Sequence, residues 1–84
     1  MKYQLVIPKG AQKELKRIDK KSKLKILSAL VALSKDPYLG KKLEGKYKGK
    51  WSYRIWPYRI IYQVRQKELV ILIICIVHRQ GAYK

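Results

Sequence analysis

Apolar residues near the N-terminus change from a strand-like run to a helical spacing. Residues 2–7 are rich in β-formers and end at Pro8, which lacks an N–H but suits the first turn of a helix. Ala11, Leu15 and Ile18 then follow at helical spacing, with basic residues between them. This pattern predicts a short strand followed by a short amphipathic helix.

A second apolar stretch with helical spacing predicts a helix over residues 21–34. Asp19 precedes it and is placed to end the first helix or to cap the second. Asp36 is followed by Pro37, and a residue before proline avoids the helical region, so the helix should end there. Two helices joined by one or two residues form a helical hairpin. The residues expected on one side of the second helix are Leu24, Leu27, Leu30, Val31 and Ser34.

Three strands are predicted after a stretch rich in glycine and lysine, residues 40–49. Pro57 and the polar residues 65–67 mark the turns between them. The last strand is apolar without alternation, which predicts a central strand covered on both faces. The expected bounds are 51–56, 58–65 and 68–77.

A strand, two helices and three further strands in this order predict an α+β domain. We expect the helical hairpin to pack on one face of a small, mainly antiparallel sheet of four strands, with the first strand beside the last. The 84 residues are expected to form a single domain, 1–84. The other face of the sheet is left for lysine, arginine and tyrosine side chains.

Charge narrows the function classes. Lysine and arginine number 21 against five acidic residues, which gives a formal net charge of +16. Self-repulsion of this size destabilises a compact state unless a polyanion or an acidic partner relieves it. The balance predicts contact with nucleic acid and storage with an acidic protein. The alternative interpretation is that the charge only keeps the protein soluble, or that the chain is a binding protein of the ribosomal type.

Cysteine usage indicates the compartment. Cys75 is the single cysteine, which excludes an intramolecular disulfide and paired-cysteine metal spacings. It lies in an apolar run and is expected to be a small core residue. The longest apolar run, residues 69–77, is too short to cross a bilayer as a helix. With no signal sequence, these features predict a cytoplasmic protein without a membrane segment.

Known phosphate-loop patterns and a Ser/His/Asp arrangement are absent from the sequence, and the few carboxylates are scattered, so a two-metal nuclease is not expected. The remaining chemistry is metal-independent RNA cleavage, in which the 2′-hydroxyl attacks the adjacent phosphate. It needs a base, an acid and fixed positive charge at the phosphorane. The candidate residues are Arg54, Arg59, His78, Arg79 and Tyr83. Each can instead be an ordinary strand, strand-end or tail residue.

Aromatic residues lie among these cations and suit base stacking on single-stranded RNA. Alternation along a strand points Trp51 and Tyr53 one way and Arg54 and Trp56 the other. At most one of the two sets can face RNA, and the other is expected in the core.

Nearly the whole chain resembles the RelE/ParE toxin superfamily. The resemblance rests on the segments KLEG (42–45), WSYR (51–54), YRIIYQV (58–64) and VHRQGAY (77–83). Its most specific parts are Y-R-I-I-Y and the terminal H-R-x-x-x-Y, and the superfamily has the same order of elements. Two departures are Ser52, where the usual residue is arginine, and Trp56-Pro57, where Gly-Asp is usual.

The resemblance implies a RelE-type mRNA interferase: the toxin of a type II toxin–antitoxin system, which cleaves mRNA on the ribosome without a small-molecule cofactor. By matching position, Arg59 would contact the phosphate, and Arg79 would stabilise the transition state or protonate the leaving group. His78 and Tyr83 would be acid, base or stacking groups. Its implied partners are the ribosome, mRNA and a cognate acidic, RelB-like antitoxin. The expected nucleic-acid-binding lysines are Lys41, Lys42, Lys46, Lys48 and Lys50.

Two other functions stay open. One is a ParE-like toxin that poisons DNA gyrase by binding, although such proteins generally lack the His-Arg…Tyr terminus found here. The other is an RNA- or ribosome-binding protein without catalysis.

Overall fold

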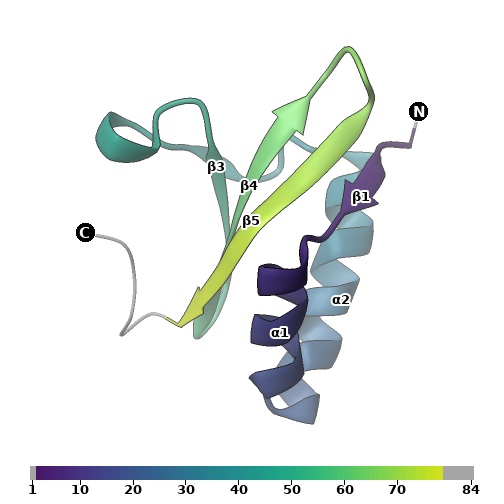
Figure 1. Cartoon of the computed structure of the whole chain (residues 1–84), viewed down its shortest axis with the longest axis vertical. Helices are drawn as coiled ribbons and strands as arrows, with labels where there is room; N and C mark the ends of the chain where they lie inside the picture. The colour runs from purple at the N-terminus through teal and green to yellow at the C-terminus, as the bar shows by residue number, and fades with distance from the viewer. Residues whose placement is uncertain (1, 79–84) are drawn as a thin grey trace.

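A helical hairpin lies against one face of a mixed sheet in the computed structural model, which describes residues 2–78 (Figure 1). The α+β class and the strand–helix–helix–strand order are confirmed, but the sheet has five strands rather than four. A short 3-10 turn, Gly45–Tyr47, precedes the third strand. The helices are α1 (Lys9–Arg17) and α2 (Lys20–Lys35), and the strands are β1 (Gln4–Val6), β2 (Lys41–Lys42), β3 (Trp51–Ile55), β4 (Tyr58–Arg65) and β5 (Val70–His78).

The strand order across the sheet is β1-β5-β4-β3-β2. β1 runs parallel to β5, which confirms that the first strand lies beside the last, and all other neighbours are antiparallel. The additional strand is β2, where Lys41 pairs with Ser52 and Lys42 with Trp51. Two lysines between glycines carry no strand pattern, so only the pairing with β3 reveals this strand.

Both ends of α2 follow the local signals in the sequence. The Asp19 carboxylate accepts a hydrogen bond from the Ser22 backbone N–H at 3.0 Å, which caps the helix N-terminus. At the other end Asp36 has an extended backbone and precedes Pro37. Asp19 therefore caps the second helix, one of its two expected roles.

The apolar spacing of α2 predicted the wrong buried side for this helix. Leu30 and Ser34 are buried, but Leu24, Leu27 and Val31 are 59%, 41% and 51% exposed. The helix is apolar around most of its circumference, and its opposite side makes the contact with the sheet instead. The α2 residues buried against the sheet are Ile26, Ala29, Leu30 and Leu33.

β5 is an interior strand of the sheet, between β1 and β4, as expected, but only one of its faces is fully covered. Ile71, Ile73 and Ile76 are buried in the core under the helices, whereas Leu72 and Val77 on the other face are half-buried. Cys75 is likewise only half-buried and forms no disulfide. No helix within residues 2–78 covers this second face, called the open face below, although Ile61 and Ser52 on it are buried.

The far end of β5 is attached to α1 through a side chain. β1 pairs only with Val70–Leu72, so the rest of that β5 edge needs other hydrogen-bond partners. Glu14 of α1 accepts a hydrogen bond from the Ile76 backbone N–H at 2.9 Å. This contact fixes the strand end that leads to His78. None of the helices formed by the described residues is long and apolar enough to cross a membrane.

Candidate functional site

Two arginines face each other on the open side of the sheet. Arg54 of β3 and Arg59 of β4 are direct cross-strand partners, one pair inward from the Ile55–Tyr58 pair that closes the hairpin. Arg54 is exposed and Arg59 is half-buried. Like charges directly opposite each other destabilise a sheet. The arrangement therefore favours a bound anion between the two guanidinium groups.

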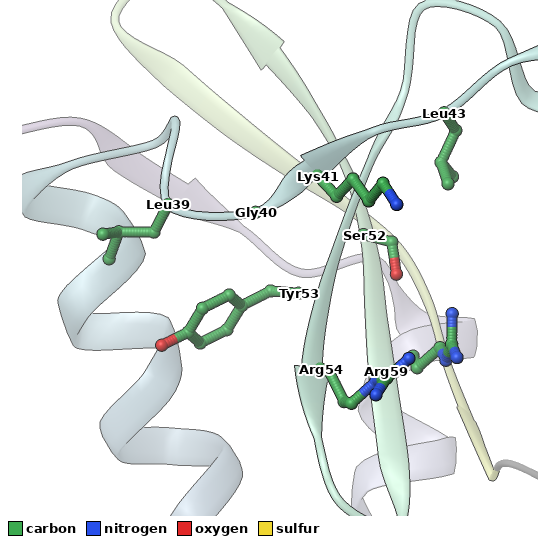
Figure 2. Close-up of a pocket in the computed structure, with 8 residues that line it drawn as sticks. All are labelled: Leu39, Gly40, Lys41, Leu43, Ser52, Tyr53, Arg54 and Arg59. Atoms are coloured by element: carbon green, nitrogen blue, oxygen red, sulfur yellow. The ribbon is translucent and has the colours of Figure 1, made fainter.

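A pocket of about 420 Å³ lies beside this pair (Figure 2). Lys41, Ser52, Arg54 and Arg59 project to the same side of the sheet, while Tyr53 points toward the helix side. Among the described residues, three cations and no acidic residue line the pocket, and two leucines supply apolar walls. It can therefore hold a phosphate and, beside it, an apolar or aromatic group such as a base. The full lining is Leu39, Gly40, Lys41, Leu43, Ser52, Tyr53, Arg54 and Arg59.

A buried tyrosine holds the lysine side of the pocket in place. The Tyr62 hydroxyl donates to the Pro37 carbonyl at 2.8 Å and accepts from the Gly40 N–H at 3.1 Å. Burial raises the pKa of Tyr62 to about 12, so the phenol stays neutral. Gly40 has no space for a side chain, because a Cβ there would lie against the Tyr62 hydroxyl and 2.7 Å from the Ser52 carbonyl oxygen.

Tyr62 and Gly40 are site residues that the sequence did not indicate. The Tyr62 partners lie 25 and 22 residues away along the chain, and no local pattern marks such a link. Their tie anchors the segment that leads from α2 into β2. Lys41, which follows Gly40 directly, is thereby fixed next to β3.

His78 lies at the same end of the sheet as the arginine pair but on its other face. It pairs in register with Tyr58, and the two rings meet edge-to-face with centroids 5.2 Å apart. Because neighbouring strand residues point to opposite faces, the side chains of Tyr58 and Arg59 lie on different sides. The structure thus brings Arg54 and Arg59 together but not His78. Arg79 and Tyr83 lie outside the described residues.

The expected nucleic-acid-binding lysines cluster on β2 and on the connection from β2 to β3. Lys41 lines the pocket, and Lys42 is exposed on β2. The Lys46 ammonium lies 5.8 Å from the centroid of the Tyr47 ring. Lys48 is exposed, and Lys50 is half-buried, with its carbonyl accepting from the Leu43 N–H at 2.9 Å. Of these five lysines, called the lysine border below, Lys41 lines the pocket, and Lys42, the next residue along β2, points to the other face of the sheet.

Of the two aromatic sets on β3, the one with Trp51 and Tyr53 packs against the core. Trp51 also meets Tyr38 edge-to-face at 5.2 Å. The other set holds Arg54, on the open face, and Trp56, which is 60% exposed. The expected division of β3 between core and surface is therefore confirmed.

Metal ligation finds no support in the described part of the chain. Among residues 2–78, no three His, Cys, Asp or Glu side chains come together in a group that could hold an ion. The side chains that can act on a ligand at this pocket are cationic, hydroxyl and apolar.

Several solved toxins share this fold. The archaeal RelE–RelB complex from Pyrococcus horikoshii has a chain 30% identical, with 98% of this chain and 100% of that chain covered and a TM-score of 0.83. The RelBE2 toxin–antitoxin complex of Mycobacterium tuberculosis gives 23% identity, coverage of 94% and 100%, and a TM-score of 0.86. A YoeB/ParE toxin from Agrobacterium tumefaciens is 22% identical, with 89% of this chain and 96% of that chain covered and a TM-score of 0.76.

The fold is thus that of the small α+β toxins found in toxin–antitoxin systems. The family described as "ParE toxin of type II toxin-antitoxin system, parDE" matches residues 5–83. The chain therefore belongs to the RelE/ParE superfamily of type II toxins. A search of curated protein sequences found no match.

Proposed function

We propose that this toxin is a ribosome-dependent, metal-independent mRNA endoribonuclease that blocks translation in the cytoplasm. The observation that carries the proposal is the directly paired Arg54 and Arg59 beside a pocket that Lys41 lines, with no acidic residue among its described lining. Such a site suits the pentacoordinate phosphorane, whose negative charge exceeds that of the ground-state phosphodiester.

The proposed reaction is an internal transfer within the RNA. The 2′-oxygen attacks the adjacent phosphorus while a base takes its proton, and the bond from phosphorus to the 5′-oxygen breaks. That oxygen receives a proton, which leaves a 2′,3′-cyclic phosphate and a 5′-hydroxyl. Arg59 and Arg54 hold the phosphoryl oxygens through their guanidinium forks.

The remaining candidate residues complete the proposed mechanism. Arg79 shares the transition-state charge or protonates the leaving oxygen, and Tyr83 and His78 are the acid, base or stacking groups. His78 lies on the other face of the sheet and needs to leave its contact with Tyr58 to reach the arginine pair. Among residues 2–78, no histidine or carboxylate lines the pocket, and in this proposal the ribosome positions the substrate.

Mapping of mRNA 5′ ends after expression in cells tests this function. New ends within translated codons, carrying 5′-hydroxyls, are expected. Purified protein should cleave mRNA on ribosomes and act poorly on free RNA. Equal, efficient cleavage of free RNA would contradict the ribosome dependence.

A ParE-like poison of DNA gyrase is the second candidate, because the matching family description is that of ParE toxins. It predicts DNA breaks that depend on gyrase, with mRNA left intact. Assaying both damage types in the same induced culture separates the two functions.

We further propose that the partner in storage is a cognate acidic, RelB-like antitoxin. Leu24, Leu27 and Val31 form an exposed apolar stripe on α2, flanked by exposed Lys20 and Lys35. That surface complements an amphipathic helix with acidic borders. The solved Pyrococcus horikoshii relative is itself a RelE–RelB complex.

Co-expression with the adjacent short reading frame tests the partner. A complex that weakens with salt is expected. Val31→Lys should weaken it strongly, whereas Gln66→Lys in the β4–β5 turn adds the same charge elsewhere and should not. Absence of a complex at low salt would rule this partner out.

A further inference from the structure

The β3–β4 turn carries the most exposed large apolar side chain among the described residues. Trp56 is 60% exposed, whereas Trp51, the other tryptophan of the chain, is half-buried against Tyr38 and the core. An indole is a large apolar surface that a folded protein ordinarily covers. The exposed part of this indole is accessible to a ligand.

Its position relates it to the arginine pair. The turn has only two residues, Trp56 and Pro57, between the paired residues Ile55 and Tyr58. Consecutive strand residues advance by about 3.3 Å, so the Trp56 backbone lies about 7 Å from that of Arg54. One nucleotide of an extended strand can bridge that separation. A strand with a phosphate at Arg54 and Arg59 can therefore reach the turn that carries Trp56 with its next nucleotide.

The surroundings favour RNA over an acidic protein as the occupant. Arg54, Arg59 and Lys41 line the pocket next to the turn, and their positive charges attract a polyanion. The pocket beside them has the size and the apolar walls for one base, so bases and phosphates can alternate along this surface. The closed two-residue turn also limits the backbone freedom of Trp56, which lowers the entropy lost on binding.

We propose that Trp56 is a stacking platform for a base of the bound RNA, next to the phosphate held by Arg54 and Arg59. This inference rests on the proposed function. It assigns a binding role to a position where the superfamily resemblance fails. Stacking on one aromatic side chain contributes about 1–3 kcal/mol per base, which corresponds to a 5- to 150-fold change in affinity.

Tryptophan fluorescence gives a direct test. The Trp51→Phe variant retains Trp56 as its single tryptophan. It is titrated at low salt with a short single-stranded RNA that carries 2′-O-methyl groups and so resists cleavage. Saturable quenching of the Trp56 emission is expected. The matched control is Trp56→Phe, which retains Trp51 alone and should show little quenching.

Affinities separate stacking from a structural role. Trp56→Ala should bind the oligonucleotide about 5- to 150-fold more weakly, and Trp56→Phe should retain most of the affinity. On an abasic oligonucleotide with the same phosphates, Trp56→Ala should bind as the parent protein does. Unchanged affinity of Trp56→Ala for the normal oligonucleotide overturns the inference. So does an equal loss on the abasic one, which indicates a structural effect.

The outcomes also distinguish this inference from the function beneath it. If the parent protein cleaves mRNA on ribosomes and Trp56→Ala cleaves and binds equally well, only the stacking role is wrong. If Trp56 is quenched by RNA but no cleavage occurs, the stacking role stands and the ribonuclease proposal fails. Quenching by the acidic partner and not by RNA assigns Trp56 to the protein interface and overturns the inference.

Discussion

The two faces of β3 and β4 contrast sharply although the same strands supply both. Toward the helices, Ile60 and Tyr62 are fully buried in the core. On the open side, Arg54 and Arg59 meet as a pair of like charges beside a pocket. Since side chains alternate along a strand, each position serves one face only. Stability and ligand contact are therefore carried by separate, interleaved residues, and substitutions should affect one without the other.

The largest effect is expected on the helix-covered side. Leu33 of α2 is fully buried in the core, so Leu33→Ala should lower the free energy of unfolding by about 2–5 kcal/mol. Urea denaturation measures this change. A loss below about 1 kcal/mol would contradict the assignment of this helix face to the core.

Removal of a pocket arginine should lower the cleavage rate and leave the stability of the fold almost unchanged. Arg59→Ala is expected to reduce single-turnover cleavage on ribosomes at least about 100-fold, the usual loss for a group that stabilises transition-state charge. The free energy of unfolding of this variant should change by less than about 0.5 kcal/mol. The substitution removes one of two repelling charges and leaves the core side chains in place.

Arg65→Ala is the matched control for Arg59→Ala. Arg65 lies on β4 too, is exposed, and pairs with Glu68 at 3.8 Å in a surface ion pair of small energy. Cleavage by this variant should equal that of the parent protein. If both variants lose activity alike, total charge rather than the pocket is responsible.

Tyr62 links the two faces, and its loss should have an intermediate effect. Tyr62→Phe leaves the Gly40 N–H and the Pro37 carbonyl without this partner and should destabilise the fold by about 1–3 kcal/mol. Cleavage should also fall, because the segment that leads into Lys41 loses this anchor and only the pairing of β2 with β3 still holds Lys41 in place.

The difference in unfolding free energy between the parent protein and Tyr62→Phe should also depend on pH. The folded-state pKa of Tyr62, about 12, exceeds its ordinary value of 10.0, so the native state favours the neutral phenol. The stabilisation is fully present below pH 10 and is lost as pH rises through 12. The gap in unfolding free energy between parent and Tyr62→Phe should narrow over that range. A gap that widens instead would contradict the buried, neutral phenol.

The smallest effect is expected at the lysine border. Lys42→Ala should weaken RNA binding slightly and reduce the slope of log affinity against log salt by about 0.7–1, with the cleavage rate of bound RNA unchanged. Lys67→Ala, in the β4–β5 turn away from the pocket, is the control. Equal slopes for both variants would show that the border makes no local phosphate contact.

Most of the fold was predictable because its signals are local. Asp19 caps α2, Pro37 follows its end, and the three strand patterns after residue 50 match β3, β4 and β5 to within two residues. The β2 strand and the outward face of α2 could not be predicted, because both depend on long-range packing. Leu24, Leu27 and Val31 match a helical spacing as well as the buried residues do.

The candidate site was predictable only in part, for a related reason. Arg54 and Arg59 flank one tight turn, so their proximity follows from the hairpin alone. The face on which His78 lies depends on the exact register between β4 and β5, where one extra residue, Ile74, is inserted near Ile61 and Tyr62. Alternation cannot be extrapolated through such a bulge from sequence.

The most direct test of the central claim is an analysis of RNA ends. Purified toxin is incubated with mRNA on ribosomes in the presence of a chelator. The chelator binds Zn²⁺ and other transition metals but not the Mg²⁺ that the ribosome needs. The account predicts fragments with 2′,3′-cyclic phosphate and 5′-hydroxyl ends from the parent protein and from Arg65→Ala, and about 100-fold fewer from Arg59→Ala. Intact mRNA, or fragments with 5′-phosphate ends, would contradict it.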